Sequence, residues 1–224
     1  MIALRCSRLS CHRPQWSDGP SCVHDITLDF EEARLHGVTG PPGGGKTLLL
    51  HLLGLLDEPD FGTIDLFGES VSPAPEEIRR EIRNTVFGYI FPSPCLLPSF
   101  TVAENVAMPL FRLSGADERA AHERVAELFA LFGLEHVANL PAASLDFDMQ
   151  FLAALARALV HRPRVLLVLN PGRPAALAPH IRAVVDKLRI TCLWSGAQAG
   201  WLNQCDRSVT LQSGSVVPES PALS

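Results

Sequence analysis

Eight consecutive residues carry the most specific chemistry in this chain. Residues 40–47 read Gly-Pro-Pro-Gly-Gly-Gly-Lys-Thr, which fits the phosphate-loop pattern G-x-x-x-x-G-K-[ST]. Glycines allow successive backbone N–H groups to turn inward around a polyphosphate, and a following helix N-terminus adds partial positive charge. Lys46 is expected to reach the β- and γ-phosphates, and the Thr47 hydroxyl is expected to ligate Mg²⁺. The predicted phosphate-contacting residues are Gly40, Pro41, Pro42, Gly43, Gly44, Gly45, Lys46, Thr47 and Leu48.

Two features of this region depart from an ideal phosphate loop. Pro41 and Pro42 each lack the N–H donor that such a loop uses. His36 and Gly37 are poor residues for the centre of a buried strand leading into it. The alternative is a glycine-rich turn that carries a lysine by chance. The chain has 17 arginines and only two lysines, Lys46 and Lys187, so a lysine at this position is notable.

The surrounding pattern predicts the elements that position this loop. Alternation of apolar and polar residues, or a short apolar run, predicts strands over residues 2–9, 23–30, 63–67, 86–91, 165–169, 190–194 and 208–212. Helices are expected over residues 47–56, 75–83, 116–132, 151–160 and 175–188, and residues 10–21 are expected to form a loop. Strands that alternate with helices indicate an α/β fold with a parallel sheet covered on both faces. The antiparallel-looking start indicates a small β subdomain beside it.

Composition excludes several classes of protein. The chain has 224 residues, of which 47% are apolar and 19% charged, so it is not intrinsically disordered. No apolar run approaches the roughly 20 residues that a membrane-spanning helix needs, and the first residues lack the order of a secretory signal. A net charge of −5 gives no basic surface for nucleic acid. The six cysteines form no C-x-x-C pair and are expected to be reduced thiols.

Segments downstream of the loop resemble the ATPases of ABC transporters. The resemblance rests on residues 54–64 (GLLDEPDFGTI), 96–106 (LLPSFTVAENV), 156–160 (ARALV), 205–207 (CDR) and Gly214. The second of these segments is similar to the subfamily that drives lipoprotein release and macrolide-type export. The resemblance implies a RecA-like phosphate-loop core, an N-terminal antiparallel β subdomain and an α-helical subdomain near residues 92–155. It places one nucleotide-binding domain over residues 1–217, with a flexible tail at 218–224.

The same resemblance implies partners and ligands. Such domains bind ATP with Mg²⁺ and dimerise head to tail, so that ATP lies between one chain's phosphate loop and the other chain's signature motif. We therefore expect a homodimer, or a heterodimer with another ABC ATPase, together with an integral-membrane permease and no nucleic acid. The expected location is cytoplasmic, peripheral to the inner face of the membrane.

Two of the family's catalytic motifs are altered in this chain. The signature Leu-Ser-Gly-Gly-Gln aligns with residues 145–149, which read Leu-Asp-Phe-Asp-Met. Carboxylates repel a triphosphate, and a phenyl ring prevents close backbone approach. The family's Asp-Glu pair aligns with Leu169 and Asn170. Leucine cannot hold Mg²⁺, and Asn170, at the general-base position, cannot accept a proton from water.

Further departures concern three single positions. The family's glutamine aligns with Pro92, its histidine has no counterpart in residues 195–198, and a helix aspartate falls near Ala175 and Ala176. Together these changes predict a subunit that keeps its phosphate loop and has impaired hydrolysis, a pseudo-ATPase. One alternative is an active ATPase in which Asp146, Asp148 or Glu104 replaces the lost carboxylates. A phosphate-loop kinase is a third, but no substrate-binding lid is recognisable. Trp16 is the candidate for stacking on the adenine base.

Overall fold

The computed structural model describes residues 1–14, 21–113, 117–171, 174–196 and 199–217. Trp16 and the tail after residue 217, both singled out above, lie outside these residues. Among the described helices, none is long and apolar enough to cross a membrane. All six cysteines are free.

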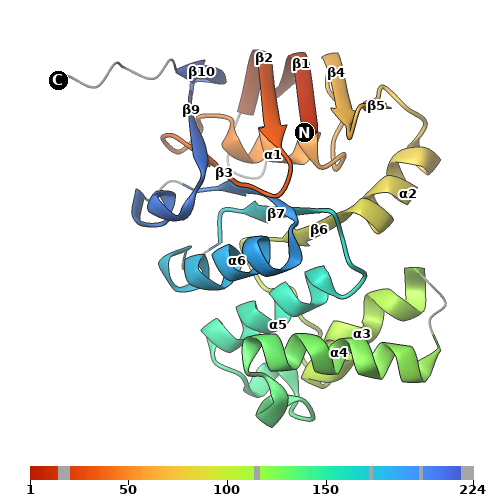
Figure 1. Ribbon diagram of the computed structural model, residues 1–224. Coiled ribbons are helices and arrows are strands. Elements are labelled where there is room, and N and C mark those ends of the chain that lie inside the picture. Colours follow the sequence, from red (N-terminus) through yellow and green to blue (C-terminus); the bar gives the residue numbers. More distant parts are fainter. Residues whose placement is uncertain (15–20, 114–116, 172–173, 197–198, 218–224) are drawn as a thin grey trace.

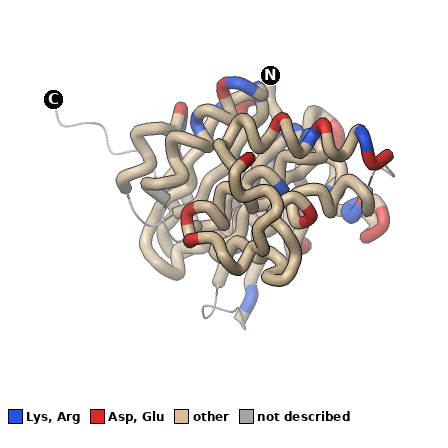
Figure 2. The backbone as a smooth tube through the Cα atoms, turned by 90° about the horizontal axis from the view of Figure 1, so that it is seen from below, with Lys and Arg blue, Asp and Glu red and all other residues tan. Residues whose placement is uncertain are grey.

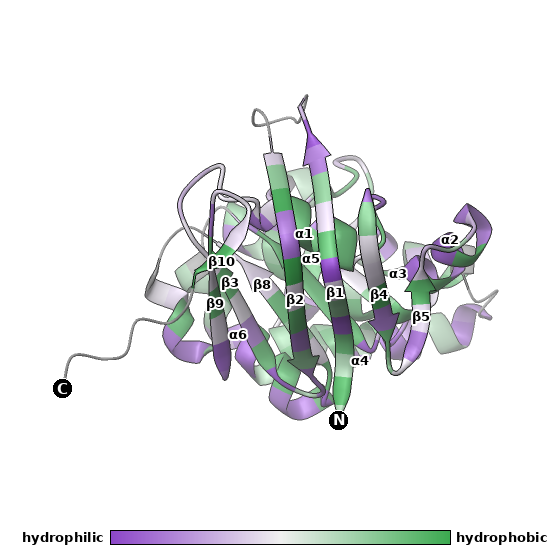
Figure 3. Cartoon of the chain, turned by 90° about the horizontal axis from the view of Figure 1, so that it is seen from above, coloured by the Kyte–Doolittle hydropathy of each residue, from purple (hydrophilic) through white to green (hydrophobic). Residues whose placement is uncertain are grey.

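Two sheets form the framework of the described chain. The first is antiparallel in the order β2-β1-β4-β5 and contains β1 (Ile2–Arg13), β2 (Ser21–Glu31), β4 (Phe61–Leu66) and β5 (Glu69–Ser72). The second has the order β10-β9-β3-β8-β7-β6, with β3 (Leu35–Thr39), β6 (Phe87–Ile90), β7 (Val165–Leu169), β8 (Thr191–Ser195), β9 (Arg207–Gln212) and β10 (Ser215–Val217). All its pairings are parallel except the β9–β10 hairpin. Hydrophobic and hydrophilic residues alternate along β1 and β2 (Figure 3), as strands with one buried face require.

The helices divide into layers around these sheets (Figure 1). Helix α1 (Lys46–Leu53) lies between the two sheets, and its leucines share one apolar cluster with residues of both. Helices α5 (Phe147–Leu159) and α6 (Pro174–Leu188) cover the other face of the parallel sheet. Helices α3 (Val102–Leu113) and α4 (Glu118–Phe132) pack on α5, and α2 (Glu76–Val86) lies beside β6 at the edge. Three short 3-10 turns complete the fold: Glu135–Val137, Ala142–Ser144 and Ala199–Gln204.

This arrangement confirms the predicted α/β fold with its parallel sheet and antiparallel β subdomain. The expected loop over residues 10–21 is wrong at both ends, because β1 and β2 continue to pair as far as Arg13 and Ser21. The helix expected from residue 151 begins four residues earlier, at Phe147, because the carboxylate of Asp146 accepts a hydrogen bond from the backbone N–H of Met149 and caps it. Strands β5 and β10 and helix α3 were not predicted.

His36 and Gly37 occupy the centre of a buried strand, against the expectation from their residue types. The His36 ring lies 2.9 Å (Nε2) from the backbone oxygen of Glu31, and burial lowers its pKa, so the neutral ring has a polar partner inside the protein. At Gly37 a Cβ would lie 3.0 Å from Leu202 Cδ2 and 3.1 Å from Cys205 Sγ. Close packing under β3 therefore explains the glycine.

Candidate nucleotide-binding site

The glycine-rich loop joins the end of β3 to the start of α1 with several residues in the left-handed region. Gly40 has φ 137° and Gly45 has φ 94°, which glycine adopts without the steric cost that other residues meet. A Cβ on Gly45 would lie 2.4 Å from the backbone oxygen of Cys22, and one on Gly40 would lie 1.9 Å from that of Leu211. Both glycines are thus required by the backbone path and by the close approach of β2 and β9.

Two other segments brace the loop from outside. The backbone N–H of Gly214, in the β9–β10 turn, donates to the backbone oxygen of Gly44 at 3.2 Å. Gly214 in turn accepts a hydrogen bond from the backbone N–H of His24 in β2 at 2.8 Å. The loop is therefore held between both sheets, which gives Gly214, noted in the sequence only for its resemblance, a definite role.

Lys46 is the first residue of α1, and its ammonium group points back into the glycine-rich loop. The side chain is buried, and its Nζ donates to the backbone oxygens of Gly40 at 2.8 Å and Pro41 at 2.7 Å. Burial lowers the pKa of this lysine. Carbonyl dipoles balance an ammonium less well than a full negative charge does, so the loop is electrostatically suited to an anion.

The two prolines remove only part of the donor set. Pro41 and Pro42 are exposed and have no N–H, but the Pro41 carbonyl accepts from both Lys46 and the backbone N–H of Gly44, the latter at 3.1 Å. The first N–H groups of α1 have no partner within the helix and point toward the loop. These N–H groups and the Lys46 ammonium are the donors that this loop can offer to an anion. The Thr47 side chain, half-buried at the start of α1, is the one predicted magnesium ligand that the loop supplies.

The parallel sheet brings the predicted general-base position to the same edge as the loop. In the ladder, Val38 of β3 and Leu169 of β7 both pair with Ser195 of β8. Asn170 follows directly, is exposed, and its backbone N–H donates to the backbone oxygen of Ser195 at 2.9 Å. The Asn170 amide can orient a water molecule by hydrogen bonding, but it has no proton-accepting charge at neutral pH.

The Leu169 side chain has no atom that could coordinate a metal ion. It is fully buried in the apolar cluster that also contains the leucines of α1. Among the described residues, no group of three or more His, Cys, Asp or Glu side chains could hold a metal ion. Within the part of the chain that the structure describes, the Thr47 hydroxyl remains the predicted Mg²⁺ ligand of this loop.

A stacked pair of tryptophans, which the sequence did not predict, lies at the end of β8. The rings of Trp194 and Trp201 are parallel to within 14° with centroids 4.6 Å apart, and both are fully buried. Gly196 lies against them, since a Cβ there would be 2.7 Å from Trp201 Nε1. Ser195 and Gly196 offer no imidazole at this edge. Residues 197 and 198 lie outside the part of the chain that the structure describes.

The segment aligned with the signature motif forms the start of α5 in another layer of the molecule. Asp146 caps this helix through the backbone N–H of Met149 at 2.8 Å, so its carboxylate occupies the positive helix end that would otherwise attract an anion. Phe147 is exposed and meets Phe151 edge-to-face, with ring centroids 4.8 Å apart.

Two of the proposed replacement carboxylates are already used locally. Asp146 caps α5, as described. Glu104 accepts hydrogen bonds from the backbone N–H of Thr101 at 2.7 Å and from its hydroxyl at 2.8 Å, and so closes the N-terminus of α3. Hydrogen bonds from Thr101 lower the pKa of Glu104. A low pKa makes a carboxylate a weak general base.

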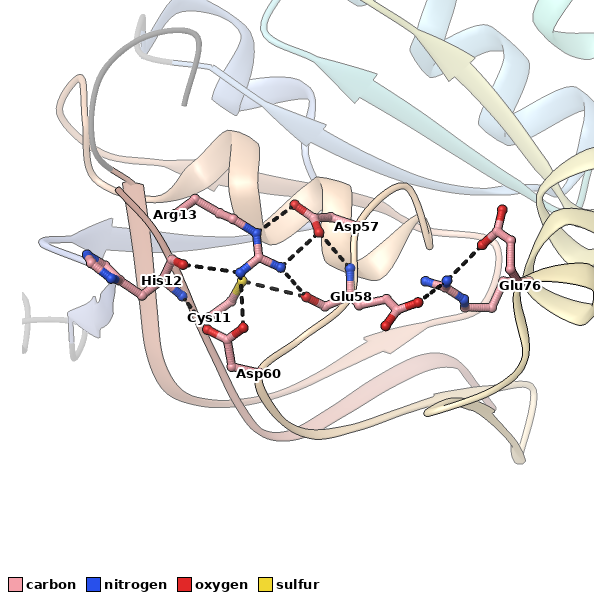
Figure 4. A network of polar contacts seen from close by, with 8 residues as sticks. Cys11, His12, Arg13, Asp57, Glu58, Asp60 and Glu76 are labelled. Atoms are coloured by element: carbon pink, nitrogen blue, oxygen red, sulfur yellow. Dashed lines mark hydrogen bonds and ion pairs between the residues drawn. The ribbon is translucent and has the colours of Figure 1, made fainter. Parts of the chain in front are cut away.

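The segment after α1 is fixed by an ion-pair network around Arg13 (Figure 4). The Arg13 guanidinium donates to Asp57 at 2.9 and 3.1 Å, to Asp60 at 3.0 Å and to the backbone oxygen of Glu58 at 2.6 Å. Burial opposes the charged form of Asp57, but the hydrogen bonds from Arg13 outweigh it and lower its pKa. The His12 N–H and Arg13 lower that of Asp60. This network ties β1 to the chain that leaves α1.

We expect Arg13→Gln to lower the free energy of unfolding by about 1–3 kcal/mol at pH 7, because it removes the charged donor shared by two carboxylates. Carboxyl groups with a lowered pKa stabilise the fold above their ordinary pKa, and this contribution is lost as pH falls through the folded-state value. The difference in free energy of unfolding between wild type and variant should therefore become smaller below about pH 4. Thermal melts from pH 3 to 8 measure it. Arg8→Gln, which breaks a pair exposed by 86% and 75%, is the control and should change little; equal melting curves for wild type and Arg13→Gln would contradict the role of the network.

Comparison with known proteins agrees with this geometry. The family model described as "ABC transporter" matches residues 23–171. The lipoprotein-releasing system ATP-binding protein LolD 2 of Caulobacter vibrioides is 34% identical over 198 residues, which cover 86% of each chain. The LolD protein of Bacteroides thetaiotaomicron is 38% identical over 147 residues, covering 66% of this chain and 67% of that protein.

Solved structures share the fold at lower identity. A dimeric structure of the ATP-binding cassette MJ0796 bound to ADP and Pi has a TM-score of 0.82 at 22% identity, covering 95% of this chain and 96% of that chain. The cbiO1 subunit from Clostridium perfringens, part of the transporter complex cbiONQ, has a TM-score of 0.84 at 20% identity, covering 96% and 87%.

Proposed function

Since the chain belongs to the ABC transporter family of ATP-binding proteins, we propose that it is the nucleotide-binding subunit of a lipoprotein-releasing or macrolide-export-like transporter, with ATP binding kept and hydrolysis impaired. The observation that carries this proposal is the contrast at one sheet edge. Lys46 and Thr47 begin α1, after the loop that follows β3, whereas Leu169 ends β7 and Asn170 follows it.

Nucleotide binding is supported by the loop itself. Its glycines follow a path that larger residues could not, and the buried Lys46 ammonium has only carbonyl partners among the contacts described above. The proposed contacts of ATP are residues 40–48, with Thr47 on Mg²⁺. The metal should be weakly held, because Leu169 supplies no second ligand.

Impaired hydrolysis is supported by the residues at the catalytic positions. When bound, the magnesium nucleotide supplies the bond to be broken; this chain's own residues would have to orient water and accept its proton. Asn170 can do the first but not the second. Glu104 and Asp146 are engaged in their own helix termini, so neither is placed to substitute.

The proposed partners follow from the relatives. We place the chain at the cytoplasmic face of a membrane beside an integral-membrane permease, paired with itself or with another ABC ATPase. In such a pair each composite site would take its loop from one chain and its signature segment from the other. Asp146 and Phe147 would then face the partner's nucleotide, so this chain would weaken both sites.

Titration of an intact ABC ATPase, one with Asp-Glu after its buried strand, tests this proposal. Light scattering first establishes that the two chains form a complex. We expect the partner's ATPase activity to fall or stay unchanged as this chain is added. A variant with Asp146→Ser, Phe147→Gly and Asp148→Gly should raise the activity of the mixture above that given by the wild-type chain. Stimulation to a normal rate by the wild-type chain would show that its signature segment can complete a site.

A further inference from the structure

A pocket of about 320 Å³ lies at the end of the parallel sheet opposite the phosphate loop. It is formed where the chain enters β3, β7 and β8 and where α5 and α6 end. The phosphate loop follows the other end of β3, so the two sites lie at opposite ends of the same strands. The pocket is lined by Glu32, Ala33, Phe67, Arg124, Leu159, Arg162, Pro163, Arg164, Leu188, Arg189, Ile190 and Thr191.

The lining of this arginine pocket is strongly cationic. Four of its residues are arginines and only Glu32 is acidic. In Figure 2, basic and acidic positions are interspersed along the backbone tube. The excess of charge is unusual for a protein with a net charge of −5.

Two of the four arginines have evident structural partners. Arg124 donates to the backbone oxygens of Leu159 at 2.9 Å and Val160 at 3.1 Å, where it completes the C-terminal end of α5, and to Glu127 at 2.8 Å. Arg162 lies 3.6 Å from the same Glu127 and is largely exposed. Glu127 is therefore shared between these two cations, and Arg124 already donates to the backbone oxygens at the C-terminal end of α5.

The other two arginines are not explained by such pairing. Arg164 and Arg189 are exposed, and within the described residues neither guanidinium has a hydrogen bond or ion pair to a carboxylate. The guanidinium carbon of Arg164 lies 3.2 Å above the Phe67 ring, which orients the group by a cation–π contact but leaves its N–H donors free for a ligand.

Hydrogen bonds fix the backbone from which the Arg164 side chain extends. The Arg164 N–H donates to the backbone oxygen of Val86 at 2.9 Å, and its carbonyl accepts from the Thr191 N–H at 3.1 Å. The Thr191 hydroxyl accepts from the backbone N–H of Ala33 at 3.1 Å. Arg189 has φ 55°, a left-handed conformation that arginine rarely adopts. The Arg164 backbone and its guanidinium on Phe67 are thus oriented without a ligand, which reduces the entropy that ligand binding must overcome.

We propose that the arginine pocket binds a small multivalent anion of the phosphate or phosphate-ester class, with Arg164 and Arg189 as its main ligands. Guanidinium groups donate two parallel hydrogen bonds to phosphate oxygens, and a pocket of this volume accommodates a small ligand. A free phosphate compound and a lipid headgroup share this chemistry.

Calorimetry with inorganic pyrophosphate tests the free-ligand source. The titration uses the full chain carrying Lys46→Ala, so that the phosphate loop does not contribute. We expect binding that weakens at least tenfold when Arg164→Gln and Arg189→Gln are added, and that weakens steeply with salt. Arg164→Lys with Arg189→Lys keeps the charge and should recover part of the affinity. The matched control is Arg8→Gln with Arg119→Gln, which removes two exposed positive charges elsewhere.

Vesicle sedimentation tests the lipid source, with phosphatidylglycerol in phosphatidylcholine against phosphatidylcholine alone. Loss of either pyrophosphate or vesicle binding in the Arg164 and Arg189 variant, but not in the control pair, supports the proposal and identifies the source. The proposal is overturned if neither probe binds, or if both pairs of substitutions weaken binding equally. Melting curves of every variant confirm that it is folded.

Discussion

The purified chain should hydrolyse magnesium-ATP at the background rate, and Asn170→Glu alone should not restore turnover. General-base catalysis contributes about 10²–10⁴ in rate, and the amide of Asn170 forfeits it. The single substitution restores one carboxylate only. Leu169 still leaves the metal without its second ligand, and the Asp-Phe-Asp segment still replaces the partner's phosphate contacts.

The local structure gives a further reason for the failure of the single variant. Asn170 has φ 43°, a left-handed conformation that asparagine tolerates better than glutamate does. Leu169 is fully buried among apolar side chains, so Leu169→Asp would place a charge in the α1 cluster unless Mg²⁺ is bound beside it. Restoration therefore needs several changes together.

Steady-state phosphate release at saturating magnesium-ATP is the measurement. The comparison set is wild type, Asn170→Glu, Leu169→Asp with Asn170→Glu, and the last combined with Ser-Gly-Gly at residues 146–148. Only the variant that carries all of these changes should release phosphate clearly faster than background. A wild-type turnover of order 1 per second or more, abolished by Lys46→Ala, would establish an active ATPase and refute the impaired one.

The sequence predicted the parallel sheet well because that signal is local. Residues 165–169 form a short apolar run, and β7 occupies those same residues, buried on both faces. The loop at residues 40–47 was equally clear, since it is one contiguous motif between a strand and a helix. Its bracing by Gly214 and the close approach of Cys22 could not be predicted, because both depend on which strands of the two sheets approach the loop.

Other features were missed because some residues serve two purposes. The Asp146 segment was interpreted as an altered signature motif, which stays a prediction, and its capping of α5 was missed. Ser10–Arg13 contains residues typical of loops, yet the hairpin continues through it because Arg13 binds Asp57 and Asp60. Helix α3 contains Pro109, which locally opposes a helix, and it forms because Val102 and Val106 are buried against the core.

The Trp194–Trp201 stack and the arginine pocket were beyond sequence reasoning for a different reason. Each joins residues that lie apart in the chain and have no pattern of spacing. Arg124 lies in α4, Arg164 directly precedes β7 and Arg189 lies between α6 and β8, and only the fold brings them to one pocket. Such sites require the fold to be known first.

Lys46→Ala should abolish binding of ATP and ADP, with a loss of at least a hundredfold, or about 2.7 kcal/mol. The ammonium is buried, its pKa is lowered by that burial, and its partners are two backbone oxygens. A polyphosphate would give this charge its full counter-ion inside a shielded loop, where charge-assisted hydrogen bonds are strong. Removing the ammonium removes the only lysine at the site and leaves the carbonyls of Gly40 and Pro41 facing the anion.

Lys187→Ala is the matched control, since Lys187 is the other lysine of the chain and lies exposed in the last turn of α6. Calorimetry with each nucleotide, with and without Mg²⁺, should show unchanged affinity for this variant. In the wild type, Mg²⁺ should add less than the tenfold in affinity that one further carboxylate-held ligand, about 1.4 kcal/mol, would give, because Thr47 is the one protein ligand that we propose and Leu169 supplies no second. Equal nucleotide affinity with and without Lys46 would mean that the glycine-rich segment is a structural turn, and a large gain with Mg²⁺ would mean that a metal ligand other than Leu169 exists at this edge.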